Sequence, residues 1–491
     1  MPAATPSLVS PATPAAQPGS DRRARLALAT VMVGAFMSLL DTTIVNVALP
    51  SIQHGLGASD SALEWVVSGY ALAFGLVLIP AGRLGDAIGR KPLYVAGLVI
   101  FLLASLGAGL AQSAAGIVMA RIVQGLGAGT FYTQINATIV DMFAGPKRSR
   151  AFGVLAAVIG LSTAVGPLVG GLLITAAGPH TGWRWIFLVN LAIGAAAVPA
   201  AVRFLPAPVR RARQHADAGG IGLLTAALVL VLLPLIEGQA SGWPAWTYGC
   251  FVAAVPLLAG LWLWERRAER AGRTPLIPPR VVRRPAFATG AVFALLYFAS
   301  FTSIFFSLAV TWQEGFAHGA LASGLVVSPF ALGAIVTARR SHAIAARLGR
   351  RILVLGTAIV TAGLTALLVV FHVTGEPSAW YLVAPLLAVG LGHGLIVAPN
   401  IDLVLQSVPA SDNGSASGVL NTAQRIGSAL GIAVVGTVLF GTLRPAADSG
   451  PALAAAFSHS FQAALVVNIA LSAATFALAL VTPGTPAGRR S

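Results

Sequence analysis

The sequence has few charges and almost no cysteine. Only 9% of its 491 residues are Asp, Glu, Lys or Arg, whereas a soluble globular protein carries about 25%. So few charges cannot cover a surface that faces water, which excludes an ordinary soluble protein. The one cysteine, Cys250, excludes an intramolecular disulfide and a cysteine metal cluster.

Motifs for nucleotide hydrolysis and for zinc chemistry are also absent. Neither of the two lysines, Lys91 and Lys147, follows the G-x-x-x-x-G pattern of a phosphate-binding loop, and no H-E-x-x-H pattern occurs. An ATP-driven pump or a membrane enzyme is therefore a poor interpretation. We expect no enzymatic activity and no metal.

Hydrophobic residues, by contrast, make up 56% of the chain and recur in long runs. Runs of about 20 apolar residues have the length that a helix needs to cross roughly 30 Å of hydrocarbon. The pattern predicts an all-α polytopic membrane protein with fourteen transmembrane helices. We place these spans at 26–50, 62–82, 92–111, 115–141, 150–174, 184–205, 218–237, 246–264, 286–312, 320–338, 352–372, 379–406, 415–442 and 461–482.

Positive charge is concentrated in the segments on one side of these spans. The formal net charge is +16, and 27 of the 31 Lys and Arg residues fall inside if the N-terminus is cytoplasmic. An even number of spans then puts both termini in the cytoplasm. The charge is an orientation signal and a contact for anionic lipid, so we expect a lipid bilayer and no nucleic acid as partner. Arg outnumbers Lys, and Ala and Gly are abundant, which favours a bacterial plasma (inner) membrane.

The sequence of the first half of the chain resembles that of the second half. Residues 65–72 (WVVSGYAL) align with 325–332 (LVVSPFAL) at an offset of 260, and 125–129 (GLGAG) align with 390–394 (GLGHG) at an offset of 265. A nearly constant register over about 100 residues predicts two six-helix halves, an architecture that transporters use with the substrate between the halves. The predicted organisation begins with a disordered cytoplasmic tail (1–24) and an N-terminal six-helix half (25–206). A linker with two extra transmembrane helices (207–285), a C-terminal six-helix half (286–482) and a cytoplasmic tail (483–491) follow.

The loop after the second span carries a specific motif. It reads GRLGDAIGRKPL (82–93) and resembles the G-x-L-x-D-x-x-G-R-K-x-x-L signature loop of the major facilitator superfamily. The resemblance implies the major facilitator fold and a loop that latches the two halves together on the cytoplasmic side. The second-half copy, HAIAARLGRR (342–351), has alanine in place of the aspartate. We therefore assign the latch to the first copy, through Gly82, Asp86, Gly89, Arg90 and Lys91.

Two further motifs resemble the same superfamily. The fourth span carries RIVQGLGAG (121–129), which is similar to its R-x-x-Q-G-x-G-x-G motif, and the fifth carries GLSTAVGPLVGGLL (160–173), which resembles its antiporter motif. In the family, the antiporter motif accompanies exporters that exchange a drug for a proton. A flexible packing helix without directional meaning is the alternative, because proline bends a helix and glycines thin its surface. The motif residues are Gly160, Gly166, Pro167, Gly170 and Gly171.

The first span places a carboxylate, Asp41, inside an apolar run. The stretch LDTTIVNVALP (40–50), with 65–73 and 183–190, resembles the fourteen-span branch of the drug:proton antiporters, and this resemblance covers the whole chain. At 1.5 Å per residue, Asp41 lies roughly 20 Å from the cytoplasmic face and Arg121 about 9 Å from the other face, so their depths are similar. Ionisable residues inside a membrane are functional candidates. We predict that Asp41 couples protons to transport and that Arg121 tunes it; a structural aspartate bonded to a nearby threonine or backbone group is the alternative.

The predicted substrate cavity draws aromatic and polar residues from both halves. Aromatic rings stack on flat molecules or hold cations, whereas Arg425 would suit anionic or neutral compounds. Asp402 and His393 are left open as further titrating groups. The cavity candidates are Tyr70, Gln124, Asn136, Phe305, Phe306, Asn400, Asn421 and Arg425.

These features together predict a monomer that exports drugs, antibiotics or other small amphipathic organic compounds. It would work by alternating access, in exchange for protons, and the proton gradient would take the place of a cofactor. A dedicated exporter of a single self-made natural product is the alternative, because the motifs report coupling and not selectivity.

Overall fold

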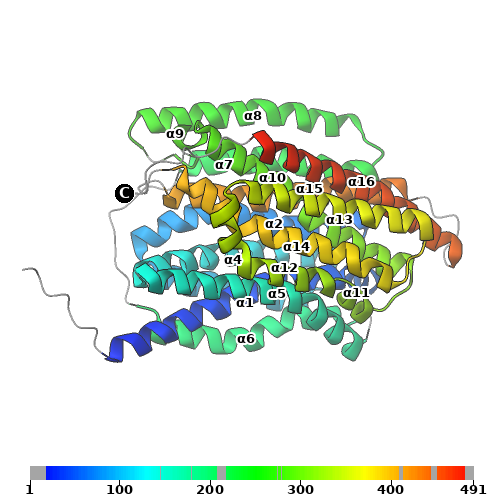
Figure 1. The fold of residues 1–491 in the computed structure, drawn as a ribbon, viewed down its shortest axis with the longest axis horizontal. Coiled ribbons are helices and arrows are strands. Elements are labelled where there is room, and N and C mark those ends of the chain that lie inside the picture. Colours follow the sequence, from blue (N-terminus) through cyan, green and yellow to red (C-terminus); the bar gives the residue numbers. More distant parts are fainter. Residues whose placement is uncertain are drawn as a thin grey trace, which may run out of the picture.

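The computed structural model describes residues 18–143, 145–178, 180–206, 217–273, 275–277, 279–408, 413–443 and 450–481. Within these ranges the chain is helical and has no β-strand (Figure 1). The first six helices are α1 (Pro18–Leu56), α2 (Asp60–Ile88), α3 (Arg90–Gly109), α4 (Ala114–Met142), α5 (Gly145–Ala177) and α6 (Trp183–Phe204). The middle of the chain forms α7 (Ala218–Ala240), α8 (Ala245–Arg270) and the short α9 (Pro279–Val282). The remainder forms α10 (Pro285–Val310), the π-helical turn η1 (Thr311–Gly315), α11 (Ala320–Val326), α12 (Ser328–Leu348), α13 (Arg351–Thr374), α14 (Ala379–Gln406), α15 (Asn413–Thr442) and α16 (Pro451–Val481).

Every predicted span coincides with helical structure. Among the described residues, thirteen helices are long and apolar enough to cross a membrane, and α5 contributes a shorter apolar stretch, Val165–Ala177. The predicted all-α polytopic class is therefore confirmed.

The largest departures from the predicted boundaries are at three places. Residues 18–24, assigned to a disordered tail, are the first turns of α1, because hydropathy marks the edge of the hydrocarbon and not the end of a helix. The span at 320–338 is divided into α11 and α12, since Pro329 cannot donate the backbone hydrogen bond that would continue the helix. The last span begins at Pro451 and not at 461. Residues 1–17 and 483–491, which belong to the predicted tails, and residue 482, the predicted end of the last span, lie outside the described residues.

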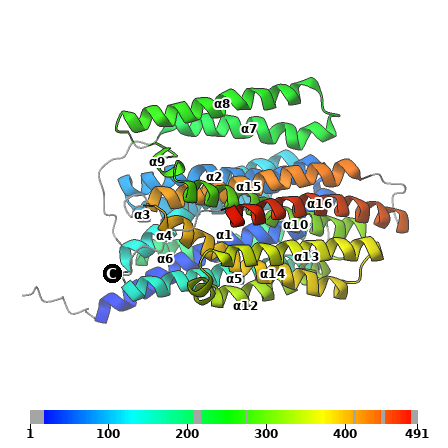
Figure 2. The same ribbon diagram turned by 45° about the horizontal axis from the view of Figure 1, so that its top comes forward.

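The two halves share one packing scheme (Figure 2). In the first half, α1 packs on α5 and α6, α3 packs on α4 and α6, and α2 packs on α4. In the second half, α10 packs on α15 and α16, α13 packs on α14 and α16, and α12 packs on α14. The halves meet where α2 packs on α15 and where α5 packs on α11 and α12. Each helix of the second half thus takes the place of a helix of the first.

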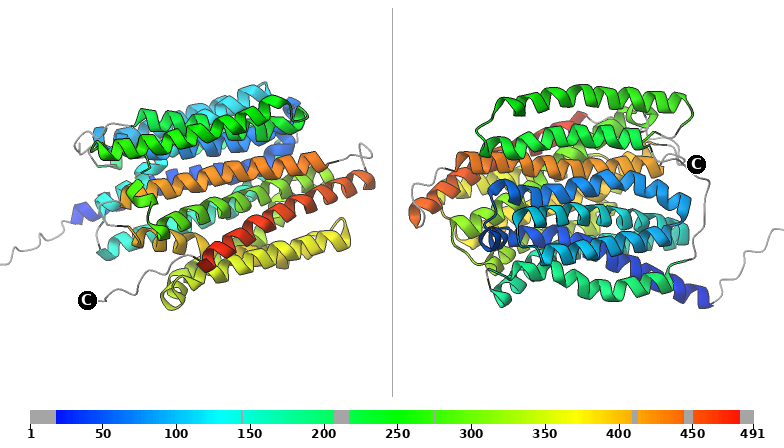
Figure 3. Two further views of the ribbon diagram at one scale, coloured as in Figure 1. Left: turned by 90° about the horizontal axis from the view of Figure 1, so that it is seen from above. Right: turned by 180° about the vertical axis from the view of Figure 1, so that it is seen from behind.

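The helices α7 and α8 form a pair at the edge of this bundle (Figure 3). Helix α7 packs on α2 and α15, so it touches both halves, whereas α8 packs on α7 and α9. We call these two helices the inserted pair.

The halves are in direct contact at the end of the bundle opposite the start of α1 (Figure 1). We call this the far end; the other end, where α1 begins and α16 ends, is the terminus end. Gln313 Nε2 of η1 donates a hydrogen bond to Val47 O of α1 at 3.0 Å. His54 Nδ1 lies 3.6 Å from Glu314 Oε1. Helix α5 lies so close to α11 that a Cβ on Gly171 would sit 2.6 Å from the α11 backbone. The far end is therefore tightly packed between the halves.

Candidate functional site

A carboxylate on α1 is enclosed by polar side chains from neighbouring helices. Asp41 is 0% exposed. Its Oδ2 accepts a hydrogen bond from Arg121 Nη1 at 2.6 Å, and its Oδ1 accepts from Gln124 Nε2 at 2.9 Å and from Asn190 Nδ2 at 3.0 Å. Arg121 and Gln124 lie one turn apart on α4, so both reach the same carboxylate. The structure thus brings together the two residues whose depths match in the sequence.

Ser105 of α3 completes this group. Its Oγ accepts a hydrogen bond from Gln124 Nε2 at 2.8 Å and lies 3.5 Å from Asn190 Nδ2. The same hydroxyl donates to Phe101 O at 2.8 Å. Four helices therefore contribute to one hydrogen-bonded unit, which we call the Asp41 network: Asp41, Ser105, Arg121, Gln124 and Asn190.

Sequence reasoning missed two members of this network. Asn190 offered a usable signal, because it is a polar residue within an apolar span and such residues often bond to neighbouring helices. Ser105 offered none, since serine in a helix commonly bonds its own backbone. Gln124 was expected in the substrate cavity, but its side chain is 0% exposed and is committed to Asp41.

The charges of Asp41 and Arg121 compensate each other, but some polar atoms of the network have no hydrogen-bond partner among the described residues. Asp41 and Arg121 are both 0% exposed, and a buried charge is stable only while its partner remains. Arg121 Nη2 and Asn190 Oδ1 have no hydrogen-bond partner among the described residues. Removal of either partner alone would therefore be costly.

Arg121 also connects the network to α2. Its Nε donates to Val66 O at 3.0 Å. Its guanidinium lies 4.1 Å from the centre of the Tyr70 ring, a cation–π contact. Tyr70 in turn directs its hydroxyl toward Ser38 O of α1 at 3.5 Å. Tyr70, predicted as a cavity residue, is 1% exposed and belongs to this buried layer.

The next turn of α2 reaches the other half of the molecule. The Arg425 guanidinium of α15 lies 4.0 Å from the centre of the Phe74 ring. Thr422 Oγ1 donates to Gly75 O at 3.1 Å. A Cβ on Gly75 would lie 2.8 Å from the Cβ of Arg425, so the glycine allows this close approach. Helix α2 therefore touches both the Asp41 network and the second half.

The second half presents a cluster of rings from α10, α12 and α14, which we call the aromatic group. The rings of Phe301 and His393 are stacked with centroids 4.3 Å apart, and those of Phe305 and Phe330 meet edge to face at 4.8 Å. The Tyr297 hydroxyl lies 2.6 Å from His393 Nδ1. Phe305 was predicted for the substrate cavity, and His393 was left open as a titrating group; the structure places both in this cluster.

Phe306 does not join the aromatic group. It is 0% exposed and packs edge to face on Phe440 of α15, with ring centroids 6.2 Å apart. Consecutive helical residues point about 100° apart, so Phe305 and Phe306 face different neighbours. Phe306 thus belongs to the packed core, which corrects its expected place in a cavity.

The remaining predicted polar residues lie apart from the network. Asn400 is 3% exposed, and its Oδ1 has no partner among the described residues. Asn421 Nδ2 lies 3.5 Å from the hydroxyl of Ser417 on its own helix. Asn136 is half-buried in α4. Asp402, left open as a titrating group, is exposed near the end of α14.

The predicted latch loop is the connection between α2 and α3. The two helices are separated by a single residue, Gly89, whose φ of 103° is the left-handed region that favours glycine. Gly82 and Lys91 are half-buried on either side of this connection. The side chain of Asp86 lies outside the described part of the structure.

The arginines of this loop tie it to other elements. Arg90 Nε donates to Asp141 Oδ2, at the end of α4, at 3.3 Å. Arg83 is 8% exposed and donates to Pro275 O, in the segment before α9. The loop is therefore anchored to its own half and to the segment that follows the inserted pair.

The glycines of the predicted antiporter motif allow close packing of α5. Gly166 and Gly170 face α1, where a Cβ on Gly170 would lie 2.8 Å from an isoleucine side chain. Gly171 and the backbone of Pro167 face α11. The surroundings of Gly160 lie outside the described side chains. The motif thus lies at a contact between the halves, where small residues let helices approach.

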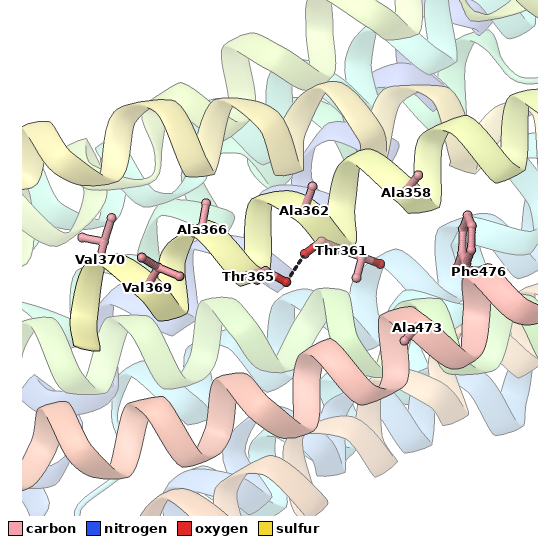
Figure 4. A pocket seen from close by; sticks show the side chains of 9 residues that line it. All are labelled: Ala358, Thr361, Ala362, Thr365, Ala366, Val369, Val370, Ala473 and Phe476. Carbon is pink, nitrogen blue, oxygen red and sulfur yellow. Dashed lines mark hydrogen bonds between the residues drawn. The ribbon is translucent and has the colours of Figure 1, made fainter. Parts of the chain in front are cut away.

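A groove of about 770 Å³ runs along the flank of the second half between α13 and α16 (Figure 4). Its lining has no charged side chain, and Thr365 Oγ1 donates to Thr361 O of its own helix at 2.8 Å. It is open to the side of the bundle and distant in the fold from the Asp41 network, so it is not part of the candidate site. Its lining residues are Ala358, Thr361, Ala362, Thr365, Ala366, Val369, Val370, Ala473 and Phe476.

Known proteins resemble the chain over most of its length. A family model described as "Major Facilitator Superfamily" matches residues 31–432. A "Probable actinorhodin transporter" of Streptomyces coelicolor is 35% identical over 87% of this chain and 75% of its own length. A "Puromycin resistance protein" of Streptomyces alboniger is 33% identical over 97% of this chain and 95% of its own. A solved bacterial homologue of the lysosomal transporter Spinster shares the fold, with a TM-score of 0.64, 15% identity and coverage of 96% of this chain and 100% of that one.

Proposed function

The chain belongs to the Major Facilitator Superfamily of membrane transporters, and from this premise we propose that it is a proton-driven antiporter. It exports small amphipathic organic compounds by alternating access. Its relatives are named for the transport of actinorhodin and for resistance to puromycin. Those names support antibiotics and similar natural products as the substrate class.

One observation carries the proton-driven mechanism: the fully buried pair of Asp41 and Arg121 at 2.6 Å. A buried carboxylate can be neutralised either by a cation beside it or by a proton. In the structure the cation is Arg121. A proton on Asp41 would take over that role and release the guanidinium, so proton binding and the position of Arg121 are linked.

Release of Arg121 would act first on α2. The arginine holds α2 through Val66 O and the Tyr70 ring, and α2 packs on α15 of the other half. A change at Asp41 therefore reaches the interface between the halves through contacts that already exist. The same helix ends in the latch loop, so one element joins the proton site to the contact that alternating access must open and close.

The substrate would bind between Arg425 on one side and the aromatic group on the other. Arg425 supplies a positive charge held over the Phe74 ring, and Phe301, Phe305 and His393 supply flat surfaces from the second half. This combination suits flat aromatic molecules that are neutral or anionic. Gln124 and Tyr70, which are buried in the Asp41 layer, would sense the substrate indirectly.

The location and orientation of the protein in the membrane follow from the same proposal. We place the protein as a monomer in the bacterial inner membrane, with both termini and the latch loop cytoplasmic. Its positive charge supports this orientation. The packed far end then faces outward, so the described conformation is closed toward the outside.

The coupling role is tested by Asp41→Asn in proteoliposomes. Asparagine keeps the size of the side chain but cannot release a proton, so we expect proton-driven efflux to fall to background while substrate exchange without a gradient continues. Glu376→Gln, in the exposed loop after α13, serves as the control and should transport normally. Full proton-driven efflux by Asp41→Asn would contradict the proposed coupling role of Asp41.

The substrate class is tested by proton-driven efflux against a panel of cationic, neutral and anionic antibiotics. We expect flat neutral or anionic members to be exported best. Transport of one compound alone would instead support the dedicated exporter, and a preference for dications would contradict the place given to Arg425.

A further inference from the structure

The inserted pair brings two carboxylates together at the terminus end of the bundle. Asp217 immediately precedes α7, and Glu265 lies near the end of α8. Glu265 is 1% exposed. Neither residue belongs to the Asp41 network or to the latch motif.

One oxygen of each carboxylate is already bonded. Asp217 Oδ1 accepts from Gly220 N at 2.9 Å and from Trp264 Nε1 at 2.8 Å. Glu265 Oε2 accepts from Ile277 N at 3.3 Å. The bond from Gly220 makes Asp217 the cap of α7, where the helix dipole stabilises a negative charge. Asp217 therefore lies where a negative charge is stabilised by the start of a helix.

The other two oxygens converge on one point. Asp217 Oδ2 and Glu265 Oε1 are both buried and have no hydrogen-bond partner among the described residues. Each lies 2.7 Å from the position that a Cβ on Gly220 would take. Both oxygens therefore border the space left by this glycine. Two ionised carboxylates placed in this way would repel each other and would lack a donor to compensate.

Two described charged side chains, Arg83 and Glu269, lie on the helices next to the pair. Arg83 of α2 lies close enough for its charge to act on both carboxylates. Glu269, one turn after Glu265, accepts a hydrogen bond from Arg280 N at 3.2 Å. Since Arg83 belongs to the sequence of the predicted latch loop, the pair lies beside that loop.

We propose that Asp217 and Glu265 share one proton and thereby form a second proton-binding site, on the inserted pair. Glu265 Oε1 carries the proton and donates it to Asp217 Oδ2, so the repulsion of two anions is replaced by a hydrogen bond. The pair keeps one negative charge, which faces Arg83. A metal ion fits less well, because only two oxygens are unfilled whereas Ca²⁺ takes six to eight.

The site gives the inserted pair a role in transport. Loss of the shared proton adds a second negative charge next to Arg83 and drives the two oxygens apart. Occupancy by the proton therefore alters how α7 and α8 hold the latch end of α2. This role does not depend on whether Asp41 couples protons to export.

Trp264 provides a built-in reporter, because its indole N–H donates to Asp217. Tryptophan emission of the purified full-length protein in nanodiscs is titrated without substrate from about pH 5 to about pH 10. The difference between the wild type and Trp264→Phe isolates the signal of this one side chain. We expect a one-proton transition that Glu265→Gln and Asp217→Asn abolish and that Glu269→Gln, the control on the same helix, retains. Its persistence in Glu265→Gln, or its absence in the wild type, overturns the proposal.

Two glycines of α7 offer a matched pair of variants that alters no ionisable group. Gly220→Ala places a methyl group against both oxygens and should move the transition by about one pH unit or more. Gly222→Ala adds a methyl group where nothing lies within 4 Å and should leave it unchanged. Identical titrations of the two variants overturn the proposal even if the carboxylate variants fail to fold.

The link to the latch loop has its own test. Arg83→Gln removes the nearby cation, so the pair should hold its proton more tightly and the transition should move to higher pH. An unchanged transition would overturn the link. All these titrations are made without substrate or gradient, so their outcome is distinct from that of the efflux experiments on Asp41.

Discussion

The two halves of the molecule place different chemistry at corresponding positions. On α4, Arg121 and Gln124 bond to a carboxylate. At the same register of α14, 265 residues later, the chain has Leu386 and Val389, which are 1% and 4% exposed. At these two positions the second half therefore has buried apolar side chains where the first half has a buried charge and an amide.

The helix pairs next to these positions differ in the same way. The pair α1 and α6 joins Asp41 to Asn190. The corresponding pair α10 and α16 joins Ser303 Oγ to Asn468 Oδ1 at 2.8 Å, and both of these side chains are 0% exposed. A neutral hydrogen bond can hold helices together but does not take up a proton near neutral pH. We expect one half to handle the proton while the other contributes mainly to substrate binding.

We expect the largest effect on stability from Arg121→Leu, which gives α4 the residue that the second half has at the corresponding position, Leu386. This change leaves the Asp41 charge buried and unpaired, so we expect a loss of about 3–5 kcal/mol in the free energy of unfolding. Thermal unfolding in detergent measures it. The double variant Asp41→Asn with Arg121→Leu should recover most of the stability but no proton coupling. An unfolding temperature of Arg121→Leu equal to that of the wild type would contradict the role of the pair.

A smaller effect is expected for Gln124→Val, which copies Val389. The change removes the bonds to Asp41 at 2.9 Å and to Ser105 at 2.8 Å, which should cost about 1–3 kcal/mol. Unfolding and proton-driven efflux are both measured. Gln462→Val, on α16, is the control: its side chain makes two polar contacts near 3.4 Å with described residues, and its loss should change stability by about 0.5 kcal/mol or less. Equal effects of the two substitutions would speak against a special network.

The smallest effect is expected for Ser303→Ala in the second half. The loss of its bond to Asn468 should cost about 1 kcal/mol, and the ratio of protons to substrate should stay the same. Proton flux and substrate flux are measured together in proteoliposomes. A lower ratio in this variant would show that the neutral network also takes part in coupling, and the contrast between the halves would fail.

The two charged residues of the candidate site, Asp41 and Arg121, could be predicted from the sequence. Asp41 and Arg121 stand out because a charge within an apolar span is costly and therefore rare, and their depths follow from counting residues along two helices. Asn190 and Ser105 were less accessible, because their role depends on which faces of α3 and α6 turn toward α1. Phe306 shows the same dependence, since a rotation of about 100° from Phe305 is enough to place it in the core.

The class of fold, the number of spans and the resemblance between the halves follow from the amino-acid sequence. Each of them is a local or periodic property: the length of an apolar run, the sign of the flanking charges, or a repeated register. The convergence of Asp217, Glu265 and Arg83 is of another kind. These residues are far apart along the chain and are brought together by the packing of α7 on α2 and on α8. Contacts between such distant residues depend on how each helix is rotated and on which helices pack together. Only the tertiary structure decides them.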